Sequence, residues 1–281
     1  MKPNSTPLSN GQDLMNQAIV SVYRWLVSRP GYMLMTADDT RLAAEAPQRF
    51  RRAWLGLMAL GLLWGVGMAC LHGAAWTVFG EVSGVVSMPV AAVVLATVAW
   101  LYRRAVVDLA RTLAGKNDVH AAPIAAGVTV LLALAMLGLK SGHPDHHDAL
   151  QWYLRWIPRT MYRTLILAPL WGAWAMLITP QFCRPTDRTE PAVAQLIAGC
   201  GPMTAAACML APLAATLYAY RMYRTVVGWW WLSISAAPIL AAIFGGWLVC
   251  RREAGPTRRA LLAANMITQI TFILTYLANI R

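Results

Sequence analysis

Charged side chains are scarce in this sequence, since only 13% of its 281 residues are Asp, Glu, Lys or Arg. Soluble proteins carry roughly a quarter charged residues. A soluble chain of this length with so few charges would expose a large apolar surface to water. Hydrophobic residues make up 58% of the chain, and its mean hydropathy is +0.48. The shortage of charge therefore argues against a soluble domain and favours a protein that lies mostly in a lipid bilayer.

Other absences concern particular kinds of chemistry. The five cysteines form no C-x-x-C pair and indicate no disulfide framework. The sequence contains no G-x-S-x-G, Walker A or H-E-x-x-H motif.

Its N-terminus has no apolar core followed by a cleavage site, so we expect no signal peptide. All twelve acidic residues lie outside the apolar runs or at their edges. That placement argues against a proton- or cation-coupled transporter, without excluding one, because such transporters normally place a carboxylate inside the bundle.

What the sequence has instead is a series of long apolar runs. Each is near the ~20 residues that a helix needs to cross the hydrocarbon core. We predict an all-α, polytopic membrane bundle of about seven transmembrane helices. Residues 1–53 form an N-terminal cytoplasmic or interfacial segment in this prediction, and 54–281 form one transmembrane domain. The predicted spans are 54–76, 84–102, 121–139, 162–179, 192–219, 227–250 and 258–279.

Glycines inside two of these spans predict close helix packing. A helix without a side chain at one position lets a neighbouring backbone approach it. The glycines are Gly61, Gly65 and Gly67 in the first span, and Gly245 and Gly246 in the sixth.

The net charge of +12 comes from 24 Lys and Arg against 12 Asp and Glu. Nucleic-acid binding is one interpretation of such an excess. Basic loops on the cytoplasmic side of a bacterial membrane explain it better, so we expect no nucleic-acid partner. With a cytoplasmic N-terminus, 17 of the 24 basic residues fall inside and 7 outside. We therefore predict a multi-pass protein of the bacterial cytoplasmic membrane, with its N-terminus inside and its C-terminus outside.

A histidine-rich loop follows the third predicted span. It holds His143, His146 and His147 together with Asp145 and Asp148. Imidazole and carboxylate groups suit zinc and similar ions. Their spacing here does not match a closed structural zinc site. We interpret the loop as a hydrophilic connection and keep the three histidines as weak metal candidates.

Three stretches resemble one known family in their order and spacing. Residues 109–115 read LARTLAG, residues 168–176 read APLWGAWAM before PQFCRP, and residues 255–266 read GPTRRALLAANM. They are similar to the L-A-D-T-A-D-G, A-P-x-x-x-R-W-A-M with P-x-A-R-P, and G-L-T-G-D-T-L-G-A-A-N-E stretches of the cobalamin synthase family. The resemblance implies an adenosylcobinamide-GDP ribazoletransferase of the last steps of cobalamin biosynthesis. Such a transferase joins ribazole to a corrinoid phosphate, releases GMP and uses Mg²⁺.

The departures from the family pattern concern the carboxylates that would hold this metal against the diphosphate. Arg111 and Arg259 stand where the resemblance implies acids, and an arginine binds a phosphate but not a cation. Asp108 and Asp118 flank the first stretch and are the nearest carboxylates in sequence, which makes them weak catalytic candidates. The candidate ligand-binding residues are Arg111, Arg258, Arg259 and Asn265.

Two hypotheses for function follow from the resemblance and the departures. The first is a membrane transferase of this family, which would retain Mg²⁺. The second is a non-catalytic relative, a pseudoenzyme that binds a phosphorylated ligand, a corrinoid, a lipid or another membrane protein. Arginines on the predicted cytoplasmic face form either an anion site for a phosphate ester or an ordinary basic inner surface. They are Arg103, Arg104, Arg111, Arg251, Arg252, Arg258 and Arg259.

Overall fold

A computed structural model describes residues 21, 29–37, 39–79, 92, 95–97, 102–115, 118–141, 160–220 and 228–279. All regular structure in these residues is helical, which confirms the predicted all-α class. The α-helices are α2 (Pro30–Thr36), α3 (Asp39–Ala43), α4 (Ala53–Phe79), α6 (Arg103–Ala114), α7 (Ala121–Ser141), α8 (Thr160–Ile178), α9 (Pro191–Gly199), α10 (Pro202–Ala219), α12 (Ser233–Leu240), α13 (Gly246–Arg252) and α14 (Arg258–Asn279). Shorter 3₁₀ or π segments are η1 (Pro47–Arg52), η2 (Asp118–His120), η4 (Thr179–Phe182), η5 (Gly228–Leu232) and the π-helix η6 (Ala241–Gly245).

Five helical stretches are long and apolar enough to cross a membrane. They are Pro47–Leu71, Arg163–Phe182, Pro202–Ala219, Ser233–Arg252 and Arg258–Asn279, and they overlap the first, fourth, fifth, sixth and seventh predicted spans. The third predicted span corresponds to α7, whose apolar part Ala121–Met136 is shorter. Most of the second, 84–102, lies outside the described residues. Five membrane-crossing helices are thus found by length and composition, and the count of seven stays a prediction.

Two sequence-based expectations about local structure are wrong. The fifth span, predicted as one run over 192–219, is two helices, because α9 ends at Gly199 and α10 begins at Pro202. Gly201 is extended, with φ −68° and ψ 171°, and a residue before proline is biased away from helical geometry. The stretch 109–115 falls between the second and third predicted spans, where the sequence predicts a loop, but it lies mostly in α6. Val106, Leu109 and Ala110 form a buried stripe along that helix at helical spacing.

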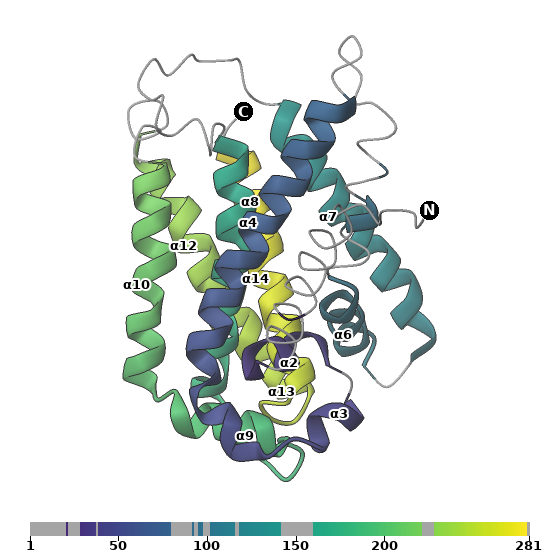
Figure 1. The fold of residues 1–281 in the computed structure, drawn as a ribbon, viewed down its shortest axis with the longest axis vertical. Helices are drawn as coiled ribbons and strands as arrows, with labels where there is room; N and C mark the ends of the chain where they lie inside the picture. Colours follow the sequence, from purple (N-terminus) through teal and green to yellow (C-terminus); the bar gives the residue numbers. More distant parts are fainter. Residues whose placement is uncertain are drawn as a thin grey trace, which may run out of the picture.

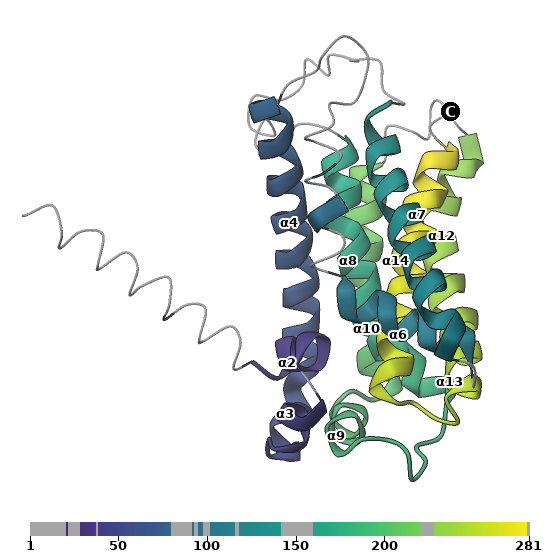
Figure 2. The same cartoon turned by 90° about the vertical axis from the view of Figure 1, so that its right-hand side faces the viewer.

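The helices form one bundle with a marked difference between its ends. Figures 1 and 2 both show α2, α3 and α9 at one end, which we call the α9 end. α4 starts at this end, and the C-terminus lies at the opposite end (Figure 1). The sequence from α4 to α14 therefore begins and finishes on opposite sides of the bundle.

The centre of the bundle is formed by α8 and α14. In the apolar stretch of α8, 78% of residues are buried, and 67% in that of α14, against 17% in that of α10. Two tryptophans of α8 tie α10 to this centre. Trp171 donates to the hydroxyl of Thr216 at 2.9 Å, and Trp174 donates to the carbonyl of Ala205 at 3.0 Å. α10 otherwise presents its side chains outward, as expected of a helix that faces lipid.

The predicted close approaches hold at four of the five glycines. A Cβ added at Gly61 would lie 2.8 Å from the carbonyl oxygen of Pro169, and one at Gly65 would lie 2.3 Å from that of Ile166. Added Cβ atoms at Gly245 and Gly246 would meet Ile267 at 3.0 Å and Thr179 at 2.3 Å. The prediction is wrong for Gly67, where nothing lies within 4 Å. Two of the three glycines predicted to pack closely in α4, Gly61 and Gly65, thus bring it against the backbone of α8.

This difference gives a matched pair of substitutions on one helix. We expect Gly65→Val to destabilise the bundle by about 1–3 kcal/mol or more, because backbone atoms of α8 occupy the space that its side chain needs. Gly67→Val, two residues away in open space, should change stability by less than about 0.5 kcal/mol. Thermal unfolding of the purified variants in detergent checks both. Equal losses would show that α4 and α8 do not meet at Gly65.

Candidate functional site

The three stretches singled out in the sequence converge on α14. α6, which holds most of the first, lies along the beginning of α14, and α8, which holds the second, lies along the same helix further up. The hydroxyl of Thr112 on α6 donates to Glu253 Oε1 at 2.8 Å, just before α14 begins. Arg252 donates to the carbonyl of Leu113 at 3.3 Å. Residues about 140 positions apart in sequence are therefore joined at the α9 end.

Charged and polar residues gather where α6, the turn after α13 and the beginning of α14 meet. We call them the α6–α14 cluster: Arg104, Asp108, Arg111, Thr112, Glu253, Arg258 and Arg259. The turn itself is shaped by Ala254 and Gly255, both with positive φ (57° and 145°). It places Glu253 over the end of α6. It also places Thr257 just before α14, where the Thr257 hydroxyl accepts a hydrogen bond from the backbone amide of Ala260 at 3.2 Å.

Asp108 is the buried carboxylate of this cluster. It lies on the inner face of α6 and is 7% exposed. Burial raises the pKa of Asp108 above its ordinary value, whereas the charges of Arg104, Arg259, Arg258 and Arg111 act to lower that pKa. The nearest of these contacts joins Arg104 Nε to Asp108 Oδ2 at 3.8 Å. One buried carboxylate thus contacts one arginine and lies in the electrostatic field of three more.

Arg258 is 2% exposed and holds the end of α2 against the bundle. Its guanidinium donates to the carbonyls of Leu34 at 2.7 Å, Met33 at 3.2 Å and Ala37 at 2.5 Å. Arg104 also donates to the carbonyl of Ala37. These carbonyls belong to the C-terminal end of α2, where a helix leaves acceptors unsatisfied. The predicted ligand candidate Arg258 therefore has its donors occupied by protein carbonyls.

The other two arginine candidates are exposed. Arg259 lies 3.7 Å from Glu253 through NH1 and Oε2, and its side chain is 45% exposed. Arg111 lies in the last turn of α6, and its guanidinium makes no hydrogen bond to any residue that the structure describes. Arg111 and Arg259 are therefore the arginine candidates that a ligand from solution can reach.

Asn265 lies deeper in the bundle, two turns into α14. It is 1% exposed and accepts a hydrogen bond from Gln269 Nε2 at 2.6 Å. Its own Nδ2 finds no acceptor among the described residues. Both amides pack against Gly172 of α8, where an added Cβ would lie 2.9 Å from Asn265 Oδ1 and 2.8 Å from Gln269 Nε2. Asn265 therefore joins α14 to α8 and does not reach the arginines of the cluster.

The carboxylates here do not form the metal site that the family resemblance implies. Asp108 faces arginines, Glu253 accepts Thr112 and faces Arg259, and Glu190 accepts the backbone amide of Arg258 at 2.9 Å. In the described ranges, no group of three or more His, Cys, Asp or Glu side chains is placed to hold a metal ion. Because these carboxylates are engaged by donors of the protein, they do not fit Mg²⁺.

The remaining sequence candidates lie elsewhere. Asp118 begins η2, beyond Gly115 and outside the cluster. His143, His146 and His147 lie outside the described residues. Asp108 and Asp118 are the nearest carboxylates in sequence, and folding adds Glu253 and Glu190. The sequence signal for Glu253 was its place between an arginine pair and the Gly255 turn.

Comparison of the chain with protein-family models, with curated proteins and with solved structures gives no match. The geometry of the α6–α14 cluster is therefore the basis for assigning a function.

Proposed function

We propose that this protein is a membrane-embedded binder of a phosphate-bearing ligand, which it holds at the α6–α14 cluster. The observation that carries this proposal is the α6–α14 cluster, in which the buried carboxylate Asp108 contacts Arg104 at 3.8 Å and is also acted on by the charges of Arg111, Arg258 and Arg259. The four arginines of the cluster outnumber its two carboxylates, Asp108 and Glu253, and also outnumber the three that are counted when Glu190 beside Arg258 is included, so a cationic excess remains.

Two of the four arginines are suited to the ligand. Arg104 and Arg258 donate to the carbonyls of α2 and support the site, whereas Arg111 and Arg259 are exposed. A guanidinium matches a phosphate with two parallel hydrogen bonds, and such charge-assisted bonds are stronger than neutral ones. A bound phosphate would accept from Arg111 and compete with Glu253 for Arg259.

The ligand class suggested by the family resemblance is a corrinoid phosphate or diphosphate ester. We propose a divergent relative of cobalamin synthase that binds such a ligand without transferring it. The alternative is an active ribazoletransferase with Mg²⁺, whose product would be a cobalamin. What favours the non-catalytic form is that Asp108, Glu253 and Glu190 are each engaged by donors of the protein itself.

For the membrane topology we propose seven spans in a bacterial cytoplasmic membrane, with the α9 end in the cytoplasm. The bias of Lys and Arg toward the segments assigned to that side supports it. A reporter fused after Arg281 should report the outer side, and one placed after Gly115 should report the cytoplasm. A cytoplasmic signal from both positions would exclude an odd number of spans.

Binding of adenosylcobinamide-GDP by the purified protein tests the ligand proposal. We expect the double variant Arg111→Gln/Arg259→Gln to bind it at least tenfold more weakly, because a hydrogen bond to a charged group contributes about 1.5–3 kcal/mol. The matched control is Arg184→Gln/Arg188→Gln, which removes two exposed arginines outside the cluster. Equal affinities of the wild type and the Arg111/Arg259 variant would contradict the proposed site.

A further inference from the structure

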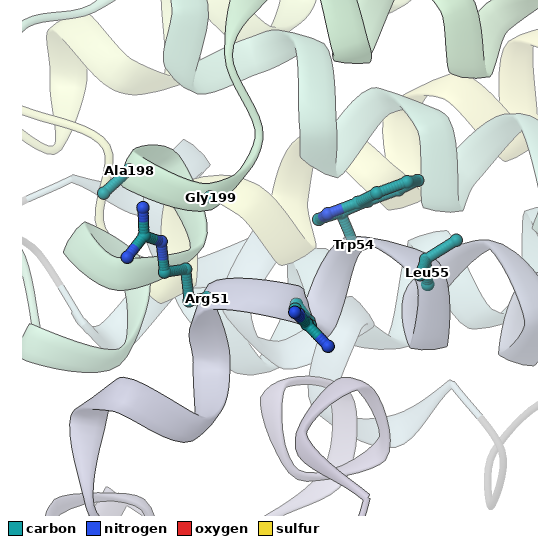
Figure 3. A pocket seen from close by; sticks show the side chains of 6 residues that line it. Arg51, Trp54, Leu55, Ala198 and Gly199 are labelled. Atoms are coloured by element: carbon teal, nitrogen blue, oxygen red, sulfur yellow. The ribbon is translucent and has the colours of Figure 1, made fainter.

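A second basic site lies where η1 passes into α4, on the side that faces the end of α9. A hollow of about 560 Å³ opens there between the two segments. Figure 3 shows the Arg51 side chain extending toward Ala198, with Trp54 and Leu55 projecting from α4. The lining residues are Arg51, Arg52, Trp54, Leu55, Ala198 and Gly199, none of which belongs to the α6–α14 cluster.

Close backbone packing holds this hollow in place. A Cβ added at Gly199 would lie 1.7 Å from the carbonyl oxygen of Arg51 and 2.9 Å from its Cγ. The last turn of α9 thus rests directly on η1, an approach that only glycine permits. Phe50 beside it is 1% exposed and anchors η1 in the core. Because η1 is fixed in this way, the backbone positions of the two arginines that follow Phe50 are fixed as well.

No residue that the structure describes neutralises the charges of these two arginines. Arg51 and Arg52 are both exposed and make no hydrogen bond or ion pair with any described residue. By contrast, Arg49 in the same segment is paired with Glu45. No carboxylate lines the hollow. Two adjacent guanidinium groups therefore offer free donors to an anion.

The hollow continues into the surface of a membrane-crossing helix. The apolar stretch that includes η1 and most of α4 runs from Pro47 to Leu71. Trp54 is the kind of side chain that lies at headgroup level. Leu55 is 56% exposed, and further apolar side chains of α4 extend the exposed surface toward the bilayer interior. They are Leu62, Leu63 and Val66.

We propose that this hollow binds the headgroup of an anionic phospholipid. Arg51 and Arg52 contact its phosphate, Trp54 covers the glycerol region, and the acyl chains lie along the exposed leucines of α4. A small free phosphate would use the arginines alone, whereas the continuity of the hollow with the apolar face of α4 matches a lipid. The attraction between the arginines and the charged headgroup and the apolar contact between α4 and the acyl chains both favour binding of the lipid.

Native mass spectrometry of the full chain, released from detergent with phosphatidylglycerol or phosphatidylcholine, tests this. We expect the wild type to retain one phosphatidylglycerol in preference to phosphatidylcholine. Arg51→Gln/Arg52→Gln should weaken that retention about thirtyfold, because each arginine near an anionic surface contributes about 1 kcal/mol. The control Arg184→Gln/Arg188→Gln loses the same charge away from the hollow and should behave as the wild type.

Three outcomes would overturn the proposal. The first is equal retention of the two lipids by the wild type, a comparison that does not depend on how any variant folds. The second is unchanged retention by Arg51→Gln/Arg52→Gln with an unfolding temperature equal to that of the wild type. The third is displacement of the lipid by soluble glycerol phosphate at comparable concentration, which would mean that the arginines recognise phosphate alone.

Discussion

Replacing Arg258 with methionine should lower the free energy of unfolding by about 3–5 kcal/mol, the loss typical of breaking a buried charge network. Methionine fills a similar volume but donates nothing. The carbonyls of Met33, Leu34 and Ala37 would lose hydrogen bonds from a guanidinium that is 2% exposed. Asp108 would also lose one of the four positive charges around it. With total stabilities near 5–15 kcal/mol, such a loss is a large fraction of the whole.

The adjacent arginine supplies the control. Arg259→Met removes the same kind of side chain from the next residue. Arg259 pairs with Glu253 at 3.7 Å, and the arginine side chain is 45% exposed. Exposed pairs contribute about 1 kcal/mol or less. Thermal unfolding in detergent measures both variants, and proteolysis within 29–37 reports whether α2 has detached. Similar losses for the two variants would show that Arg258 does not hold α2.

The second large effect concerns catalysis. Given adenosylcobinamide-GDP and α-ribazole phosphate, the protein should release no GMP above background, with or without Mg²⁺. Arg111 and Arg259 stand where the resemblance implies acids, so each replacement changes the local charge by two units. Losing one charge-stabilising group from an active site typically costs ~3–4 kcal/mol in transition-state stabilisation, or several hundredfold in rate. Losing several together should leave almost no activity.

The opposite result would be equally informative. Mg²⁺-dependent GMP release at an ordinary enzymatic rate, about 1 s⁻¹ or more, would refute the non-catalytic proposal. It would mean that Asp108, Glu253 or Glu190 exchanges its protein donors for a metal when substrate binds. Metal-independent release would instead indicate that arginines stabilise the transferring phosphoryl group, as arginines do in other phosphoryl-transfer sites.

The sequence predicted the membrane helices well where hydropathy alone decides them. α4, α8 and α14 begin and end within a few residues of the predicted spans. A chain in a hydrocarbon environment must satisfy its backbone hydrogen bonds internally, so a long apolar run has little choice but to be helical. The break between α9 and α10 was missed because Gly201 and Pro202 lie inside a run that is apolar throughout.

The sequence was a poorer guide to the candidate site. It selected Arg111, Arg258 and Arg259, which folding does bring together around Asp108. It had no means of separating Arg258 from Arg259, since both follow Thr257 and read alike. It also missed Glu253 and Glu190, whose partners lie 141 and 68 residues away. Single-residue features in a sequence do not report contacts at such separations.

What the sequence by itself determined is therefore the environment of the chain and its helical class, because scarce charge and long apolar runs act through local transfer free energies. What only the tertiary structure decided is which charges are structural and which remain available. Ala37 lies 221 residues before Arg258, and their hydrogen bond occupies that arginine. Gly199 packs against Arg51, which lies about 150 residues earlier in the sequence, and a hollow lies beside this contact. The burial and partners of a charged side chain follow from packing between distant segments, which local composition does not encode.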